Sequence, residues 1–204
     1  TSSNGSATVT QLDGRLNMVT GITAGSSCSL QSVRTARYVA GSSKHFRAVS
    51  RQEPVTGSCI HRWGAYSTSS GFGFEMSNSV FQLFSRIEGA QTNYPNGTLN
   101  GTIGSIYDSA TDNTAKTWEI YWTNHSTWWF VDDILLHKQE GSLSPLSDTL
   151  SLPIRYDLIN QSANTANNQM FTRVNSISRI GNLETAPISG RITSAGTQIL
   201  KRGD

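Results

Sequence analysis

The feature that most constrains the fold of this 204-residue chain is the alternation of apolar and polar residues in short segments. In "HFRAVSR" (residues 45–51), Phe46 and Ala48 alternate with Arg47 and Arg51. Similar runs follow, separated by Gly-, Ser- and Thr-rich breaks: "CIHRWGAY", "GFGFEM", "VFQLFSRI", "KTWEIYW", "SLPIRYDLIN" and "MFTRVNSISRI". A period of two residues is typical of β-strands, and no convincing amphipathic helix is present. We therefore predict an all-β protein, an antiparallel β-sandwich.

The chain is expected to form one main domain, because 204 residues suit a single all-β unit better than two small ones. Residues 1–31 mix small polar residues with isolated apolar ones, which predicts an N-terminal arm or peripheral strands. The single β-sandwich domain is predicted at residues 32–204. Residues 89–117 form the longest polar interruption and are predicted to be an exposed loop. We interpret the non-Met first residue and the abrupt end as signs of a processed chain or a fragment.

Composition limits the class of protein. Charged residues make up 15% of the chain, below the roughly 25% typical of soluble domains, and polarity comes from Ser, Thr, Asn, Gln and 18 glycines. This bias is common in extracellular and virion β-proteins, while five Trp, seven Phe and six Tyr indicate a packed interior. A net charge of +2 does not predict specific nucleic-acid binding, and no apolar run approaches the roughly 18 residues of a membrane helix.

Two cysteines, Cys28 and Cys59, could form one bridge or remain free thiols, and we favour free thiols. Cys59 and His61 project from the same face of one predicted strand, where Cys28 could join them. A zinc site needs a fourth ligand or a water, and no ligand pair repeats at finger spacing. We therefore predict core or surface residues here and no metal site.

The segment "TWWFVDDILLHK" at residues 127–138 places Asp132 and Asp133 inside the most apolar part of the chain. We predict that these aspartates are the central residues of a type I′ turn, because Asp tolerates positive φ, and that they need no partner at an exposed tip. Neighbouring strand residues point to opposite faces, so the two carboxylates do not form a catalytic pair. A calcium site would need about six to eight oxygens, more than two side chains supply. The expected pairs are Val131 with Ile134, Phe130 with Leu135, Trp129 with Leu136, and Trp128 with His137.

Both faces of this hairpin are apolar, whereas a strand that is exposed on one side should alternate with polar residues. One alternative is a broad double-layered core. The other is an aromatic contact patch for a protein partner or a sugar ring. We predict that four residues contribute core or interface burial: Trp128, Trp129, Phe130 and Leu136. Burial of one such side chain is worth about 1.5–3 kcal/mol, so Trp129→Ala is expected to weaken folding or assembly.

Charge is unevenly distributed along the chain. Between Gln31 and Arg62 there are six cations and one acid, whereas between Glu88 and Asp157 there are nine acids and three bases. Two differently charged surfaces would explain this bias. We also expect that four arginines steer contact with an acidic neighbour, which could be another copy of the chain: Arg34, Arg37, Arg47 and Arg51.

Catalytic patterns are weak. No Gly-x-Ser-x-Gly elbow is present, and "GFGF" at residues 71–74 lacks the following helix that phosphate binding would require. Glycines in a strand instead predict close packing of another backbone or a bulky ring. Glu75 and Glu119 are the only strand-borne glutamates worth testing as catalytic acids. We assign no catalytic, cofactor-binding or metal residue and expect that the chain is not an enzyme.

Several segments occur in an order that resembles bacteriophage and virus particle proteins with a jelly-roll or concanavalin-like β-sandwich. The resemblance covers roughly residues 35–180. The segments are "KHFRAVSR", "RWGAYSTSSGFGFEM", "FQLFSRIEG", "TWEIYWTN", "WWFVDDILLHK", "LSDTLSLPIRYDLIN" and "RVNSISRIG". The resemblance implies a structural role on the virion, as capsid decoration, a head fibre or a tail-associated module.

We therefore expect a virion structural protein at the particle surface, or otherwise a secreted protein. It would act by self-association as a homo-oligomer, with a trimer as one candidate, and by attachment to other virion proteins. The alternative function is a carbohydrate-binding, lectin-like module that attaches to a host or glycan. No cofactor, membrane or specific nucleic-acid partner is predicted.

Overall fold

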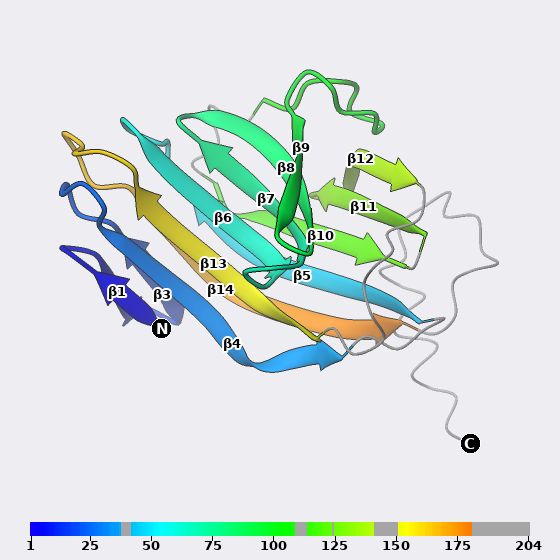
Figure 1. Cartoon of the computed structure of the whole chain (residues 1–204), viewed down its shortest axis with the longest axis horizontal. Helices are drawn as coiled ribbons and strands as arrows, with labels where there is room; N and C mark the ends of the chain where they lie inside the picture. Colours follow the sequence, from blue (N-terminus) through cyan, green and yellow to red (C-terminus); the bar gives the residue numbers. More distant parts are fainter. Residues whose placement is uncertain (38–41, 109–113, 124, 141–150, 181–204) are drawn as a thin grey trace.

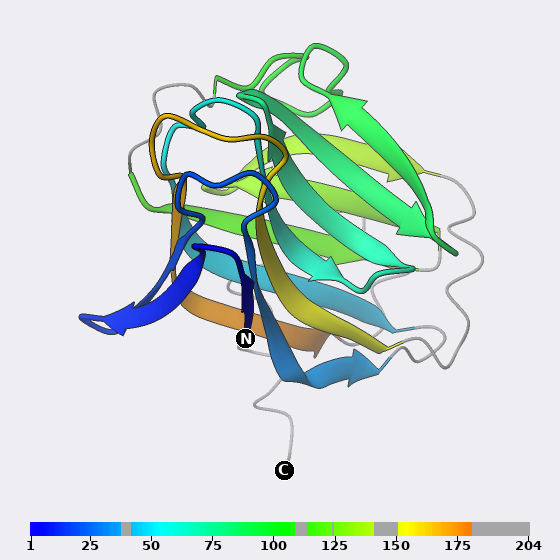
Figure 2. The same ribbon diagram turned by 60° about the vertical axis from the view of Figure 1, so that its left-hand side comes forward.

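The computed structural model describes residues 1–37, 42–108, 114–123, 125–140 and 151–180. Within these residues the chain forms two seven-stranded sheets, in which all paired strands are antiparallel. The two sheets are stacked as layers, with sheet A in front of sheet B in Figure 1 and both layers visible from the side in Figure 2. The described part of the chain contains no helix with the length and apolarity that a membrane crossing requires.

The chain passes between the two layers several times, so that each sheet combines strands from different parts of the sequence. Sheet A contains, in spatial order, β1 (Ser2–Asn4), β4 (Ser27–Arg37), β13 (Ser151–Asn160), β6 (Cys59–Tyr66), β7 (Gly71–Ser77), β8 (Val80–Ile87) and β9 (Ala90–Pro95). Sheet B contains β12 (Ile134–Glu140), β11 (Ser126–Val131), β10 (Lys116–Trp122), β5 (Ser43–Gln52), β14 (Gln169–Ile180), β3 (Arg15–Val19) and β2 (Thr8–Leu12). The strands β6–β9 and β10–β12 pair with their neighbours in the sequence, whereas β13 joins β4 to β6 and β5 joins β10 to β14, so each layer also depends on long-range pairing.

The predicted all-β sandwich is confirmed, and several strands begin and end where the alternation predicted them. The exact matches are β6, β8, β10 and β13. Residues 1–31 supply β1, β2 and β3 at one end of the two sheets, and β4 crosses the predicted domain boundary at residue 32. The prediction of one exposed loop over 89–117 is wrong for β9, which forms the edge of sheet A beside β8; residues 109–113 lie outside the described residues.

The core lies between the sheets and is dominated by aromatic rings. The indole of Trp63 on sheet A stacks on Phe74, with 5.6 Å between ring centroids. The ring of Trp118 on sheet B meets both in edge-on contacts, at 4.9 Å from Trp63 and 5.0 Å from Phe74. Such pairs add about 0.5–1.5 kcal/mol beyond the burial of their area, so this cluster joins the two layers.

The predicted turn at Asp132 and Asp133 is confirmed, because both residues have positive φ, 44° and 70°. The aspartates are not without partners: the Thr117 amide donates to Asp132 Oδ1 at 2.8 Å, and Lys116 Nζ lies 3.1 Å from Asp132 Oδ2. The turn therefore also holds the start of β10.

The predicted register of the hairpin is correct only next to the turn. Val131 pairs with Ile134 and Phe130 with Leu135, but a register shift follows, so that Trp129 pairs with His137 and Trp128 with Lys138. Leu136 is the extra residue in β12, and both Leu136 and His137 are buried. The predicted pairs of Trp129 with Leu136 and Trp128 with His137 are wrong, because a bulge inserts one residue that a simple alternation does not contain.

Both cysteines are buried free thiols, as we favoured. Burial raises the pKa of Cys28 to about 11 and that of Cys59 to about 12. Cys59 and His61 share the inner face of β6, as predicted, and His61 is fully buried between Met76 and Leu158 on the neighbouring strands. Burial lowers the pKa of His61 to about 3.

Trp129→Ala should destabilise the fold itself, because the Trp129 side chain has no exposed surface and its ring packs on Phe72 and Tyr94. We expect a loss of about 3–5 kcal/mol in the free energy of unfolding, measured by urea denaturation. The matched control is Trp128→Ala, since the neighbouring Trp128 is only half-buried. Equal losses for the two variants would contradict the assignment of Trp129 to the core.

Stability should fall as the pH drops below about 6.5, the ordinary pKa of histidine in an unfolded chain. The unfolded state takes up a proton on His61 near that pH, whereas the folded state does so only near its pKa of about 3. Between these values the free energy of unfolding decreases by up to about 1.4 kcal/mol per pH unit. Urea unfolding of wild type and His61→Leu at about pH 7 and about pH 5 checks this.

The His61→Leu variant should show a smaller loss of stability on acidification than the wild type. The control is His125→Gln, which replaces an exposed histidine outside the core. An identical pH dependence in wild type and His61→Leu would show that His61 is not the group responsible.

Candidate functional site

A row of polar side chains crosses the outer face of sheet A, the face turned away from sheet B. The strand register aligns Asp157 of β13, Arg62 of β6, Glu75 of β7 and Gln82 of β8 as direct neighbours. The alternation of each strand sends the intervening aromatic residues into the core and these side chains outward. Four strands from two separate parts of the sequence, the consecutive β6–β8 and the distant β13, therefore build one polar surface.

Asp157 is the acceptor at one end of the row. Its Oδ1 accepts a hydrogen bond from Ser29 Oγ at 2.6 Å, and its Oδ2 accepts one from the Tyr66 hydroxyl at 3.0 Å. Arg155 Nε donates to the same carboxylate at 3.0 and 2.9 Å. These charge-assisted bonds satisfy a carboxylate that is almost entirely buried and fix its orientation.

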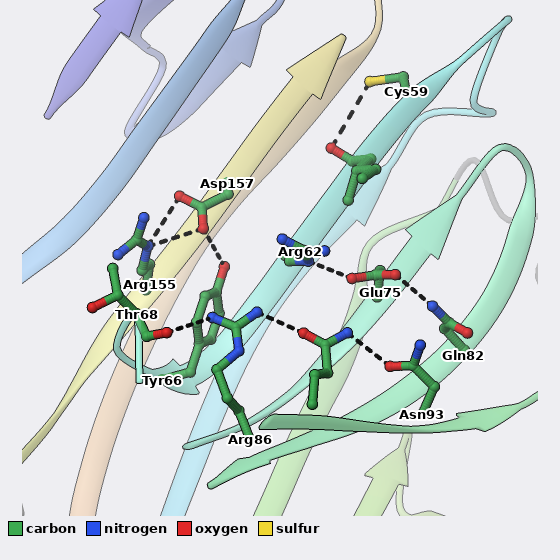
Figure 3. A network of polar contacts seen from close by, with 12 residues as sticks. Cys59, Arg62, Tyr66, Thr68, Glu75, Gln82, Arg86, Asn93, Arg155 and Asp157 are labelled. Carbon is green, nitrogen blue, oxygen red and sulfur yellow. Dashed lines mark hydrogen bonds and ion pairs between the residues drawn. The ribbon is translucent and has the colours of Figure 1, made fainter. Parts of the chain in front are cut away.

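Glu75 is the second buried carboxylate of the row. Arg62 Nε donates to its Oε2, and Gln82 Nε2 donates to its Oε1 (Figure 3). Only 4% of the Glu75 side chain is exposed, whereas Arg62 keeps 20% of its side chain at the surface. Arg62 thus compensates a buried charge on one side and remains accessible on the other.

Arg86 connects the row to the edge of the sheet. Its Nη1 donates to the Ser67 carbonyl at 3.2 Å, and its Nη2 donates to Gln91 Oε1 at 2.5 Å. The amide of Gln91 in turn donates to Asn93 Oδ1 at 2.7 Å (Figure 3). A chain of hydrogen bonds therefore runs from the arginine to β9 and along that strand to the exposed Asn93.

The buried ring of Tyr66 lies beneath two guanidinium groups. The Cζ atoms of Arg86 and Arg155 lie 5.9 and 5.7 Å from the ring centroid. Burial, followed by the charge of Asp157, raises the pKa of Tyr66 well above its ordinary value. Tyr66 is therefore a neutral hydroxyl that donates to Asp157 across the physiological pH range.

We call this surface the arginine–carboxylate network. Its members carry three positive and two negative charges when ionised, so a small positive excess remains. The network consists of Arg62, Tyr66, Glu75, Gln82, Arg86, Arg155 and Asp157.

Gly73 leaves room for an aromatic ring at the centre of this face. A Cβ atom at Gly73 would come within 2.6 Å of the Phe84 ring and 2.9 Å of the Trp63 carbonyl oxygen. Phe84 is fully buried although its strand position faces outward, because it lies against the glycine and meets Tyr66 edge-on at 5.2 Å. The prediction that the glycines of "GFGF" admit a bulky ring is confirmed at Gly73.

The two glutamates singled out from the sequence lie on opposite faces of the sandwich. Glu75 belongs to the network on sheet A, whereas Glu119 lies on the outer face of sheet B, where His45 Nε2 contacts its Oε1 at 3.1 Å and Arg47 Nε lies at 3.6 Å. They therefore cannot act as a pair on one substrate. The sequence reasoning missed Tyr66, Arg86 and Asp157 as site residues, although each occupies an outward position in a predicted strand.

The residues predicted to form an interface are divided between the core and the surface. Trp129 and Leu136 are fully buried in the core of this single chain and are not accessible to a partner. Trp128 and Phe130 are half-buried on the outer face of sheet B, where the Phe130 ring meets Tyr121 edge-on at 5.5 Å. Their use as an interface stays a prediction.

The structure does not bring the four arginines that were predicted to steer an acidic neighbour into one cluster. Arg34 and Arg47 are exposed but lie on different sheets, and Arg51 is half-buried beside Glu53, with which it forms an ion pair. Arg37 ends β4, and its side chain lies outside the described residues. Steering by these residues, like self-association, stays a prediction.

No three His, Cys, Asp or Glu side chains gather in a metal-binding arrangement within the described residues. The chemistry that the network offers is hydrogen bonding from fixed guanidinium, amide and hydroxyl donors and from two carboxylate acceptors. Such a surface suits a ligand that both donates and accepts hydrogen bonds.

Neither a protein-family model nor a curated protein sequence matches this chain. Solved structures do match its fold. The β-glucanase of Bacillus licheniformis has 15% identity and a TM-score of 0.57, covering 88% of each chain. The alginate lyase AlyC3 has 10% identity and a TM-score of 0.54, covering 81% of this chain and 75% of the other. The carbohydrate recognition domain of Emp46p has 13% identity and a TM-score of 0.53, covering 84% and 85%.

At these identities the likeness shows the fold, a jelly-roll or concanavalin-like β-sandwich, and the predicted fold class is confirmed. The expectation that the chain is not an enzyme, which rested on the lack of a catalytic sequence pattern, is contradicted, because the solved structures that share this fold include glucanases and alginate lyases. The lack of a catalytic sequence pattern was a poor guide, since the side chains of one sheet face come from distant strands. The comparisons give no support to a phage or virion origin.

Gly73→Ala should destabilise the protein, because the added methyl group would press on Phe84 and on the Trp63 carbonyl. We expect a loss of about 1–3 kcal/mol, the usual cost of overpacking, measured by urea denaturation. In the double variant with Phe84→Ala, part of the Gly73→Ala effect should disappear because the ring is gone. Strict additivity of the two substitutions would contradict the packing of Phe84 on Gly73.

Proposed function

We propose that the chain recognises a glycan on the outer face of sheet A, through the arginine–carboxylate network. The observation that carries this proposal is the convergence of buried, oriented polar side chains from β6, β7, β8 and β13 on one face. Polar groups on rigid strands are held in place before a ligand binds, which reduces the entropy lost on binding.

Unused hydrogen-bond donors support this role. Arg62 and Arg155 each engage a carboxylate through Nε, while their terminal nitrogens make no hydrogen bond within the described part of the chain. Both side chains keep about a fifth of their surface exposed. Sugar hydroxyls accept hydrogen bonds from such groups and donate to amide oxygens such as that of Asn93.

The comparisons also support a carbohydrate ligand over a virion structural role, since the matched folds include a carbohydrate recognition domain and two kinds of glycan-active enzyme. We also propose, from the sequence, that the protein is located on a virion surface or is otherwise secreted. Either location would be compatible with attachment to a glycan.

Glycan cleavage on the same face is a second candidate, favoured by the position of Glu75 and Asp157. The two acids lie in one row with only β6 between them, which corresponds to about 10 Å between their backbones. Inverting glycosidases hold their two carboxyl groups about 6.5–9.5 Å apart. Both acids here are engaged by arginines, so a catalytic role would require a ligand to rearrange these contacts.

Arg155→Lys combined with Arg62→Lys should weaken glycan binding at least about tenfold. Lysine preserves the charge opposite each carboxylate but has no guanidinium fork to contact a ligand at the same time. A glycan array containing β-glucans and uronate polysaccharides would identify the ligand, and calorimetry would give the dissociation constants. The matched control is Arg47→Lys on the outer face of sheet B, which should bind as the wild type does.

No specific, competable binding to any glycan on the array would contradict the proposal, as would equal losses in the double variant and the control. Release of reducing sugar from the bound glycan, abolished by Glu75→Gln, would favour the cleaving candidate. Binding without any release would favour recognition alone.

A further inference from the structure

A cavity of about 250 Å³ lies on the opposite side of the molecule, on the outer face of sheet B. Its walls come from β3, β5 and β14, together with residues 114–115 that precede β10. Its volume is about eight times the roughly 30 Å³ that one water occupies in the liquid. The cavity therefore has room for a small ligand and is separate from the arginine–carboxylate network.

Three arginines from three strands line this cavity: Arg15 of β3, Arg51 of β5 and Arg173 of β14. The guanidinium carbon of Arg51 lies 4.5 Å from the centroid of the Phe171 ring, which forms part of the wall. The register places Phe171 of β14 beside Asn17 of β3 and Arg51 of β5. The lining thus combines three cationic side chains with the apolar ring of Phe171.

The positive charge in the cavity is only partly compensated. Arg51 forms an ion pair with Glu53. Within the described residues, neither Arg15 nor Arg173 forms an ion pair with a carboxylate, and the Nε atoms of Arg15 and Arg51 are buried without a hydrogen-bond partner. Buried donors that lack acceptors are costly, and an anion in the cavity would supply the missing acceptors.

The backbone of β14 is interrupted at the cavity. The pairing of β14 with β5 shifts between Thr172 and Val174, which leaves Arg173 as the additional residue. Bulges of this kind redirect a side chain and occur often beside functional sites. Here Arg173 keeps the outward position, shared with Phe171, that a regular strand would give it, and the extra residue also leaves the next one, Val174, exposed.

We propose that this cavity binds a tetrahedral oxyanion, the phosphate or sulfate group of a small ligand. Three guanidinium groups approach from three strands and can donate to oxygens that point in different directions. A planar carboxylate offers two oxygens in one plane and matches this arrangement less well. The site depends on Arg173 for its charge and on Arg15 for a donor from the neighbouring strand β3.

Titration calorimetry with inorganic sulfate and inorganic phosphate, with chloride used to keep the ionic strength constant, tests the proposal. The wild-type protein should bind at least one of the two anions saturably and should bind acetate more weakly. Arg173→Gln should raise the dissociation constant at least about tenfold, since it removes one of three charged donors. Arg173 is exposed, so this variant should fold normally.

Arg15→Gln provides a second variant on the neighbouring strand β3 and should weaken binding in the same way. The matched control is Arg34→Gln, because Arg34 is exposed on sheet A and does not line the cavity. Absence of saturable binding to both anions would overturn the proposal. Equal affinities of wild type, Arg173→Gln and Arg15→Gln would also overturn it, because binding would then occur elsewhere.

Sulfated and unsulfated forms of one oligosaccharide would distinguish a free anion from a sugar ester. Tighter binding of the sulfated form, lost in Arg173→Gln, would identify a sulfate ester as the ligand. If only the free anions bind, and Arg173→Gln weakens them, the site serves small oxyanions. Either result stands independently of glycan recognition on sheet A, because the Arg62 and Arg155 substitutions should leave it unchanged.

Discussion

Aromatic packing between the sheets is the interaction on which the rest of the structure depends. Trp63 and Phe74 of sheet A meet Trp118 of sheet B within about 5–6 Å, and each comes from a strand whose other face carries polar residues. Rings that are locked in this core fix the rotation of β6, β7 and β10. As a result Arg62, Glu75 and Glu119 project outward at defined positions, where hydrogen bonds and ion pairs hold them.

The alternation of residues predicted β6, β8, β10 and β13 to the residue, because a strand with one buried face carries a strong period of two. It missed the bulge after Trp129, since one inserted residue leaves no local signal in an apolar run. It also missed the arginine–carboxylate network. Asp157 and Glu75 are 82 positions apart in the sequence, and only the order of the strands in sheet A places them in the same row of side chains.

The two outer faces differ in chemistry although both belong to the same sandwich. Sheet A presents hydrogen-bonded charge around Tyr66, whereas sheet B presents the rings of Trp128 and Phe130 at one end and the three-arginine cavity at the other. The uneven charge of the sequence is therefore not divided between one basic and one acidic surface. Arg47 and Glu119 come from differently charged parts of the chain and face each other across adjacent strands, with 3.6 Å between Nε and Oε1.

Because Cys28 and Cys59 are buried free thiols, we expect the folded sandwich to be insensitive to the redox state of its surroundings. With pKa values of about 11 and 12 they hold almost no thiolate near neutral pH, and only the thiolate attacks a disulfide or an alkylating reagent. No covalent bridge is needed to close either layer, and none forms between these residues. The rate of alkylation at Cys59 would thus report how often the two layers separate.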